Sequence, residues 1–184
     1  MTHSNREKFW RDIRYGTAAF ALGMPTIPLL IYLPPVYAEN LGLGLTATGM
    51  ALFAARFLDV VTDPLIGAAS DRITGPFGRR KPLIALGTII AAVGIILLLN
   101  PPEECGVIYL VIWSMVLYLG WTMINIPYLA WASDLHKAHA GRVRVTSIRE
   151  SFMLAGIMFA GGLSAILTGY GTSGMNSLTM VGWC

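Results

Sequence analysis

Charged residues are scarce in this sequence of 184 residues. Lys, Arg, Asp and Glu make up 12% of it and hydrophobic residues 55%, whereas an average soluble domain has about twice that charged fraction. This balance excludes an ordinary soluble domain. Only two cysteines are present, Cys105 and Cys184, and the second is the last residue, so the sequence holds no disulfide framework. The absence of any internal repeat of about 20–50 residues excludes repeat architectures.

The hydrophobic residues are concentrated in long stretches. A bilayer-spanning helix needs about 20 apolar residues, and five stretches qualify: residues 15–37, 45–69, 82–99, 106–132 and 145–167. We therefore expect an all-α, polytopic bundle of transmembrane helices. Residues 1–14 are expected to form a short cytoplasmic lead and residues 15–170 the five-helix membrane domain. Residues 171–184 are expected to form an outer-side tail that stops before a sixth span.

Basic residues occur on alternate connections between the expected spans. They precede the first span and lie between the second and third and between the fourth and fifth, whereas residues 38–44 and 100–105 hold no Lys or Arg. By the positive-inside rule, the N-terminus is cytoplasmic and the fifth span ends on the outer side. Because the net charge of +3 is sorted in this way, the expected environment is a lipid bilayer, and no nucleic-acid partner is expected.

The first span contains four prolines, Pro25, Pro28, Pro34 and Pro35. Proline removes a backbone donor and kinks a helix. The bent helix either lines a transport pathway or serves packing alone, and the sequence leaves both interpretations open. Small residues in the other spans are expected to let helices approach closely; they include Gly87, Gly94 and Gly156.

Three charged side chains, Arg56, Asp59 and Asp63, lie inside the second span. Each costs about 2.5–3.5 kcal/mol in a membrane helix, so they must face one another, an ion or a water-filled cavity. Positions i and i+4 share a helix face, so Asp59 and Asp63 point the same way. Two carboxylates at this spacing can bind a small hard cation or share a proton. A structural Arg56–Asp59 salt bridge is the simpler alternative, but one arginine cannot neutralise two acids.

Further polar side chains could contribute to the same site. Thr62 adds a hydroxyl beside Asp63. In the fourth span, Thr122 and Asn125 share a face, and they either complete an oxygen site opposite the acids or form an interhelical hydrogen bond of about 0.6 kcal/mol. Near the start of the fifth span, Arg149 either extends to the interface or turns inward to a polar ligand.

Several motifs occur in order along the chain: Asp59-x-x-x-Asp63-Pro64-x-x-Gly67, Ser70-Asp71-Arg72, Gly78-Arg79-Arg80-Lys81-Pro82, Asn125-Ile-Pro127-Tyr128 and Arg142-x-Arg144-x4-Arg149. Together they resemble the major facilitator superfamily, and most closely its glycoside–pentoside–hexuronide (GPH):cation symporter family of melibiose-carrier-like transporters. The resemblance implies a secondary active transporter in a bacterial inner membrane. It would move a sugar or glycoside-like solute with a cation by alternating access. It implies no enzyme and no cofactor, only a coupling Na⁺ or H⁺.

The resemblance also implies roles for individual residues. Asp59 and Asp63 match the carboxylates that bind the coupling cation, and Thr122 matches a hydroxyl near it; Thr62 and Asn125 are further candidate ligands. Arg56 would balance the charge of the acids. Candidate solute contacts are Arg149, which matches an inward-facing arginine near the sugar, Trp121 and Tyr128. The residues that match a cytoplasmic loop that latches the helices in one conformation are Asp71, Arg72, Arg79 and Arg80.

Some positions depart from the pattern of the family. Gly23 stands where sugar carriers commonly have an aspartate on the first helix, Asn125 replaces an acid, and Leu129 replaces a tryptophan. The cation pair is thus intact while the set that binds sugar hydroxyls is reduced. We expect a different glycoside or a more apolar solute rather than a galactoside. With Thr62 at a position that is often Asn, proton coupling is as plausible as sodium coupling.

Family members have twelve spans in two halves with the substrate between them, so five spans correspond to part of an N-terminal half. We expect a partial sequence that does not transport without the missing C-terminal half. A non-transporting regulatory or degenerate membrane module remains an alternative. A membrane CDP-alcohol phosphotransferase also uses an Asp-x-x-x-Asp pair, but it needs an Asp-Gly dipeptide, which does not occur in this sequence. An intramembrane aspartyl protease needs its acids on two facing helices.

Overall fold

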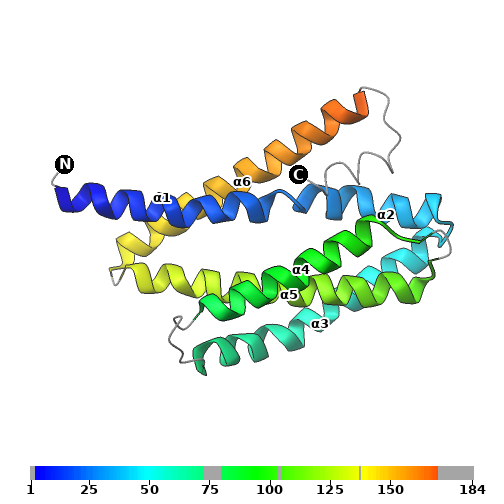
Figure 1. The fold of residues 1–184 in the computed structure, drawn as a ribbon, viewed down its shortest axis with the longest axis horizontal. Helices are drawn as coiled ribbons and strands as arrows, with labels where there is room; N and C mark the ends of the chain where they lie inside the picture. The colour runs from blue at the N-terminus through cyan, green and yellow to red at the C-terminus, as the bar shows by residue number, and fades with distance from the viewer. Residues whose placement is uncertain (1–2, 73–79, 103–104, 137, 170–184) are drawn as a thin grey trace. The chain divides into compact units, whose positions relative to one another are not determined.

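A computed structural model describes residues 3–72, 80–102, 105–136 and 138–169; the expected tail at residues 171–184 lies outside these ranges. Every regular element of the described residues is helical, which confirms the all-α expectation. Five of the helices are long (Figure 1): α1 (His3–Gly23), α3 (Leu45–Arg72), α4 (Lys81–Leu99), α5 (Val107–Leu135) and α6 (His139–Gly169).

Four segments of the described chain are long and apolar enough to cross a membrane: Phe9–Asn40, Leu45–Arg72, Lys81–Leu99 and Val107–Leu135. This makes the chain a multi-pass membrane protein. The first segment begins at Phe9 rather than at residue 15, so most of the expected cytoplasmic lead is continuous with the first helix. Within the described residues α6 is not among the four. The fifth span therefore stays a prediction.

Proline interrupts the helix of the first span. α1 ends at Gly23, two residues before Pro25, because proline has no N–H and disfavours helical geometry in the residue before it. The chain continues as the π-helical segment η1 (Pro28–Tyr32), the short α2 (Leu33–Pro35) and a second π-helical segment, η2 (Val36–Asn40). The irregular helix that the prolines predict is therefore present, and its role in a pathway or in packing stays open.

The chain forms two compact units. Unit 1 comprises Met1–Tyr32 and Ala132–Cys184, so its described part holds α1, η1, the last turn of α5 and α6. Unit 2 comprises Leu33–Trp131 and holds α2, η2, α3, α4 and most of α5. All the acids and oxygen donors predicted for the cation site lie in unit 2.

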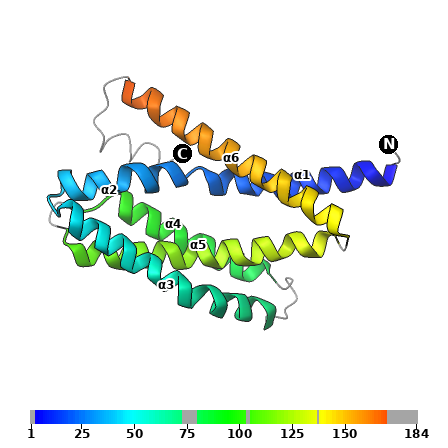
Figure 2. The same ribbon diagram turned by 180° about the vertical axis from the view of Figure 1, so that it is seen from behind.

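In unit 1, α1 and α6 cross with their backbones in contact, as both views show (Figures 1 and 2). A Cβ atom on Gly23 of α1 would lie 2.3 Å from the carbonyl oxygen of Met153. A Cβ atom on Gly156 of α6 would lie 2.2 Å from the carbonyl oxygen of Phe20. No side chain fits at either position unless the helices separate. Small residues allow this close approach in membrane proteins, and Gly156 has the packing role that the sequence predicts.

In unit 2, α4 packs on α5 through small residues. A Cβ atom on Gly120 of α5 would lie 2.5 Å from the amide nitrogen of Ala91. On α4, a Cβ atom on Gly87 or on Gly94 would come within 2.7 Å or 2.9 Å of α5 atoms. Gly87, Ala91 and Gly94 lie on one face of α4, since residues three and four apart are neighbours on a helix. The packing role predicted for the two α4 glycines is therefore confirmed.

Candidate cation site

The α3 helix carries Asp59 and Asp63 one turn apart, and Pro64 lies inside the helix directly after the second acid. Because proline has no N–H, the carbonyl of Val60 lacks its usual donor within the helix. α5 has the same feature, since Pro127 leaves the carbonyl of Met123 without that donor. Both helices of the candidate site therefore combine polar side chains with a carbonyl outside the regular ladder.

Asp63 is joined to α5 by a hydrogen bond. The buried hydroxyl of Thr122 donates to Oδ1 of Asp63 at 3.0 Å. A hydroxyl has one donor and two acceptor lone pairs, so Thr122 keeps its capacity to ligate a cation while it orients the carboxylate. The structure thus brings together the second acid of α3 and the hydroxyl of α5 that the sequence placed opposite it.

Asp59 is paired with Arg56 on its own helix. Nη1 of Arg56 lies 3.5 Å from Oδ2 of Asp59, with the two side chains 63% and 18% exposed. The guanidinium also lies over the ring of Tyr118 of α5, 5.0 Å from the ring centre. The salt bridge considered as the simpler alternative is therefore present, but it engages only the first acid, and the second is bound by Thr122.

A cavity of about 150 Å³ lies beside Asp59, and its lining residues are Leu58, Asp59 and Thr62 of α3 and Met115, Val116 and Leu119 of α5. A cavity of this volume can hold a few water molecules. Asp59 and Thr62 bring the carboxylate and hydroxyl oxygens, and the other four side chains are apolar. Apolar walls lower the local dielectric and strengthen the attraction between a cation and a carboxylate.

The atoms of the candidate site that could ligate a cation are oxygens. Within the described ranges, no three His, Cys, Asp or Glu side chains gather in a way that could hold a metal ion. The site offers two carboxylates and the hydroxyls of Thr62 and Thr122, and Asn125 lies half-buried one turn beyond Thr122. Carboxylates and neutral oxygens are the ligands of hard cations, and one carboxylate can also carry a proton.

The predicted solute contacts are divided between the two units. Trp121 is half-buried and Tyr128 is buried on α5 in unit 2. Arg149 lies on α6 in unit 1, where it is 6% exposed and forms an ion pair with Glu150. A shared solute site that includes all three therefore stays a prediction.

The predicted latch residues lie around the connection between α3 and α4. Asp71 and Arg72 are exposed at the end of α3, and Arg79 lies outside the described residues. Arg80 donates from Nη1 to the carbonyl oxygen of Pro127 at 3.3 Å. Arg80, the residue before α4, is thereby joined to α5 at the proline inside that helix.

The sequence reasoning missed Tyr118 and the apolar wall of the cavity. A signal for them exists in the spacing along α5, because Met115, Tyr118 and Thr122 are separated by three and four residues. Such residues share a helix face. Extending the face of Thr122 back by two turns would have placed Tyr118 opposite Arg56.

Comparisons with known proteins identify what the chain resembles. Residues 14–183 match the family described as MFS/sugar transport protein. The uncharacterised symporter YnaJ of Bacillus subtilis (strain 168) is 31% identical over 176 residues, which cover 93% of this chain and 37% of YnaJ. The inner membrane symporter YicJ of Escherichia coli (strain K12) is 27% identical over 151 residues, which cover 80% of this chain and 33% of YicJ.

An animal protein is also similar. The proton-associated sugar transporter A of Mus musculus is 34% identical over 95 residues, which cover 52% of this chain and 12% of that protein. The chain thus spans about a third of the length of the bacterial relatives that it matches.

Proposed function

Because the chain belongs to the MFS/sugar transport protein family, whose members named above are transporters rather than enzymes, we propose that it forms part of a secondary active symporter. The transported solute is a sugar or a glycoside-like molecule, and the coupling ion is a monovalent cation, H⁺ or Na⁺. The names of the relatives support the solute class, since they include symporters and a sugar transporter. Transport proceeds by alternating access.

The hydrogen bond between Thr122 and Asp63 is the observation that carries the proposal. It brings a carboxylate of α3 and a hydroxyl of α5 together inside two segments that can span a membrane. Ionisable groups at such positions are costly and are typical of ion pathways. Asp59, with its neighbouring cavity, supplies the second carboxylate one turn away.

Each residue of the site has a proposed role. Asp59 and Asp63 bind the cation, and Thr62, Thr122 and Asn125 supply neutral oxygens. Arg56 balances the charge of Asp59 when no cation is present, and the Tyr118 ring keeps its guanidinium in place. Cation binding then replaces the guanidinium as the partner of Asp59, which ties occupation of the site to the local arrangement of α3 and α5.

The proposed solute site has no acidic side chain on α1 to hold sugar hydroxyls. The position of that anchor is Gly23, where even a Cβ atom would lie 2.3 Å from a carbonyl oxygen of α6. Arg149, Trp121 and Tyr128 are the proposed solute contacts. This set favours a solute with fewer hydroxyl contacts than a galactoside needs.

The proposed location is a bacterial inner membrane with a cytoplasmic N-terminus. Two observations support it: the sorting of basic residues onto alternate connections and the similarity to an inner membrane symporter. Asp71, Arg72, Arg79 and Arg80 then lie on the cytoplasmic side, as a latch that stabilises one conformation during transport.

Uptake by the protein expressed from its complete gene tests the proposal. Radiolabelled sugars and glycosides are screened in membrane vesicles under a Na⁺ gradient and, separately, under a pH gradient. We expect one gradient to drive accumulation of at least one solute and Asp63→Asn to abolish it. Glu39→Gln, an exposed acid at the end of η2, is the matched control and is expected to retain uptake. Gradient-driven uptake that is unchanged in Asp63→Asn would disprove the assigned cation site.

A further inference from the structure

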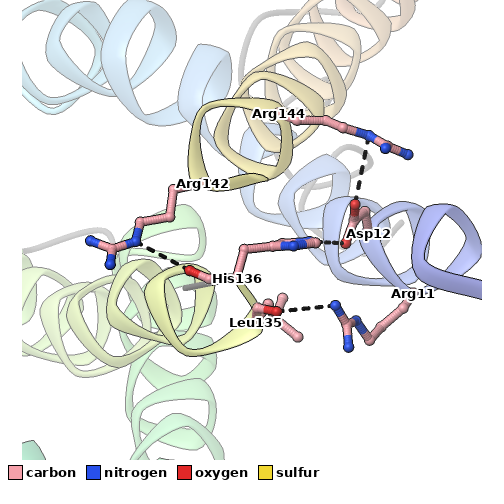
Figure 3. Close-up of polar contacts among 6 residues, drawn as sticks. All are labelled: Arg11, Asp12, Leu135, His136, Arg142 and Arg144. Carbon is pink, nitrogen blue, oxygen red and sulfur yellow. Dashed lines mark hydrogen bonds and ion pairs between the residues drawn. The ribbon is translucent and has the colours of Figure 1, made fainter. Parts of the chain in front are cut away.

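Asp12 of α1 is a fully buried carboxylate, with 0% of the residue exposed. Its Oδ1 lies 2.8 Å from Nε2 of His136, the residue that follows α5. Its Oδ2 lies 3.7 Å from Nε of Arg144 near the start of α6. Figure 3 shows the carboxylate between these two side chains. Asp12 is therefore engaged inside unit 1, and among the described residues its ion pairs are with these two side chains.

The exposed side of the same helix carries two further charges, Arg11 and Arg14. Residues three apart are neighbours on a helix surface. Nη2 of Arg11 donates to the carbonyl oxygen of Leu135, the last residue of α5, at 3.0 Å (Figure 3). Within the described part of the chain, no acid forms an ion pair with either guanidinium. Two neighbouring positive charges thus lie on this side of α1 without an acid among the described residues to balance them.

Arg11 is held in place while most of its donors are left for a ligand. A guanidinium has five N–H donors in a planar fork, and the carbonyl of Leu135 engages one nitrogen. The other donors suit an oxyanion such as a phosphate, which a guanidinium can bind through two parallel hydrogen bonds. Because Arg11 is already fixed by α5, less side-chain freedom is lost when an anion binds. The neighbouring guanidinium of Arg14 can reach the same anion.

The two arginines lie at the boundary of the membrane-spanning segments. The segment Phe9–Asn40 begins two residues before Arg11, and the segment Val107–Leu135 ends at the residue that Arg11 binds. Trp10 lies beside them and is 52% exposed. Tryptophan is enriched at the level of the lipid headgroups, and an arginine near a helix end extends its charge to that level. The three side chains are therefore placed to meet a headgroup.

We propose that Trp10, Arg11 and Arg14 bind the headgroup of an anionic phospholipid. Its phosphate accepts hydrogen bonds from both guanidiniums, and the indole packs beside the glycerol backbone, with its N–H available as a donor. Basic residues next to transmembrane helices attract anionic lipids through this charge complementarity. A zwitterionic lipid such as phosphatidylcholine binds more weakly, because its own cation offsets the phosphate. This inference does not depend on the proposed transport function.

Lipid binding followed by native mass spectrometry tests the site. The protein expressed from its complete gene is titrated in detergent with phosphatidylglycerol and, separately, with phosphatidylcholine. We expect tighter binding of phosphatidylglycerol, and we expect Arg11→Gln and Arg14→Gln each to lower that affinity about fivefold, the usual contribution of one basic residue. Lys81→Gln is the matched control, since Lys81 is an exposed basic residue at the first position of α4. An equal loss in Lys81→Gln and Arg14→Gln would show diffuse attraction to positive charge and would overturn the proposal.

Competition with inorganic phosphate separates a lipid site from a site for the free anion. Phosphate in excess should not displace phosphatidylglycerol, because it lacks the glycerol backbone that packs beside Trp10. Displacement from the native protein, but not from Arg14→Gln, would assign the site to free phosphate and contradict the proposal. Among the described residues the Arg14 side chain has no ion pair to lose, so Arg14→Gln should melt in phosphatidylcholine at the native temperature.

Hydrogen exchange tests whether the lipid holds α1 to the end of α5. Because Arg11 binds both the phosphate and Leu135, an occupied site should protect the amides in the last turn of α5. We expect about fivefold slower exchange there in nanodiscs that contain phosphatidylglycerol than in nanodiscs of phosphatidylcholine alone. The difference should vanish in Arg11→Gln and persist in Lys81→Gln. The same lipid effect in Arg11→Gln as in the native protein would contradict the proposed role of Arg11.

Discussion

Thr122 of α5 donates its hydroxyl to the carboxylate of Asp63 on α3 at 3.0 Å. The bond joins two helices at the acid that directly precedes a proline. Because the acceptor is a carboxylate, the bond belongs to the stronger class of hydrogen bonds to charged groups. The proposed binding of a cation at Asp63 would therefore be linked to the contact between α3 and α5 through one side chain.

Removal of the Thr122 hydroxyl should weaken cation binding. We expect Thr122→Val to raise the cation concentration for half-maximal uptake about tenfold, since a hydrogen bond to a charged group is worth about 1.5–3 kcal/mol. Thr122→Ser should stay close to the native value. The control is Thr88→Val, because the hydroxyl of Thr88 donates to the carbonyl oxygen of Ile84 within its own helix. Equal effects of the two valine variants would show that Thr122 has no special role.

The Tyr118 ring should contribute to the site through Arg56. A cation–π contact at an exposed site is worth about 0.5–1 kcal/mol. We expect Tyr118→Leu to change the apparent cation affinity about twofold to fivefold and Tyr118→Phe, which keeps the ring, to leave it unchanged. The measurement is cation-dependent uptake at a fixed solute concentration. A loss in Tyr118→Phe that equals the loss in Tyr118→Leu would assign the effect to the hydroxyl instead.

The crossing of α1 and α6 should not tolerate a methyl group at Gly23. We expect Gly23→Ala to lower the free energy of unfolding by about 1–3 kcal/mol, the usual cost of overpacking. Gly162→Ala is the matched control on α6, since a Cβ atom there meets nothing within 4 Å. It should be neutral or stabilising, by up to about 1 kcal/mol, because alanine is the better helix former.

Thermal melting of the two alanine variants in the same detergent gives the comparison. A Gly23→Ala protein that melts at or above the temperature of Gly162→Ala would mean that α1 and α6 can separate without cost. In that case Gly23 would not limit which side chains this position accepts.

Cys105 should react slowly with alkylating reagents. It is 8% exposed in the connection before α5, and burial raises the pKa of its thiol above the ordinary value. Because the thiolate is the reactive form, a raised pKa leaves less of it at neutral pH, and the rate should increase as the pH rises. The measurement is N-ethylmaleimide labelling in a Cys184→Ser background, with unfolding in SDS as the control. A native rate equal to that of free cysteine at neutral pH would contradict the prediction.

Much of the helical layout could be predicted from the sequence because it depends on local composition. Long apolar runs specify α3, α4 and α5 almost to their ends. The start of the first helix differs from the expectation, because the charged residues before Tyr15 favour a separate lead whereas α1 begins at His3. Asp12 belongs inside the fold because His136 and Arg144 bind it, and no local pattern contains a contact between residues more than a hundred positions apart.

Part of the candidate site could likewise be predicted from the sequence, and part depends on tertiary packing. The shared face of Asp59 and Asp63 follows from helical spacing, and the pairing of Asp63 with Thr122 could be anticipated because both lie at mid-span. Their role in cation binding stays a prediction. The contact between Arg56 and Tyr118 and the cavity beside Asp59 depend on how α3 and α5 approach each other. That approach is set by packing rather than by the spacing of residues along one helix.

The obstruction at Gly23 has a consequence for redesign of the solute preference. The atom that blocks a side chain there is a backbone carbonyl oxygen of Met153, so trimming a neighbouring side chain cannot make room. An acidic anchor for sugar hydroxyls could be restored only by changing the angle or the separation at which α1 crosses α6. A single substitution at this position therefore cannot introduce the acidic anchor. A change in the preferred solute would have to come from other residues of the proposed solute site.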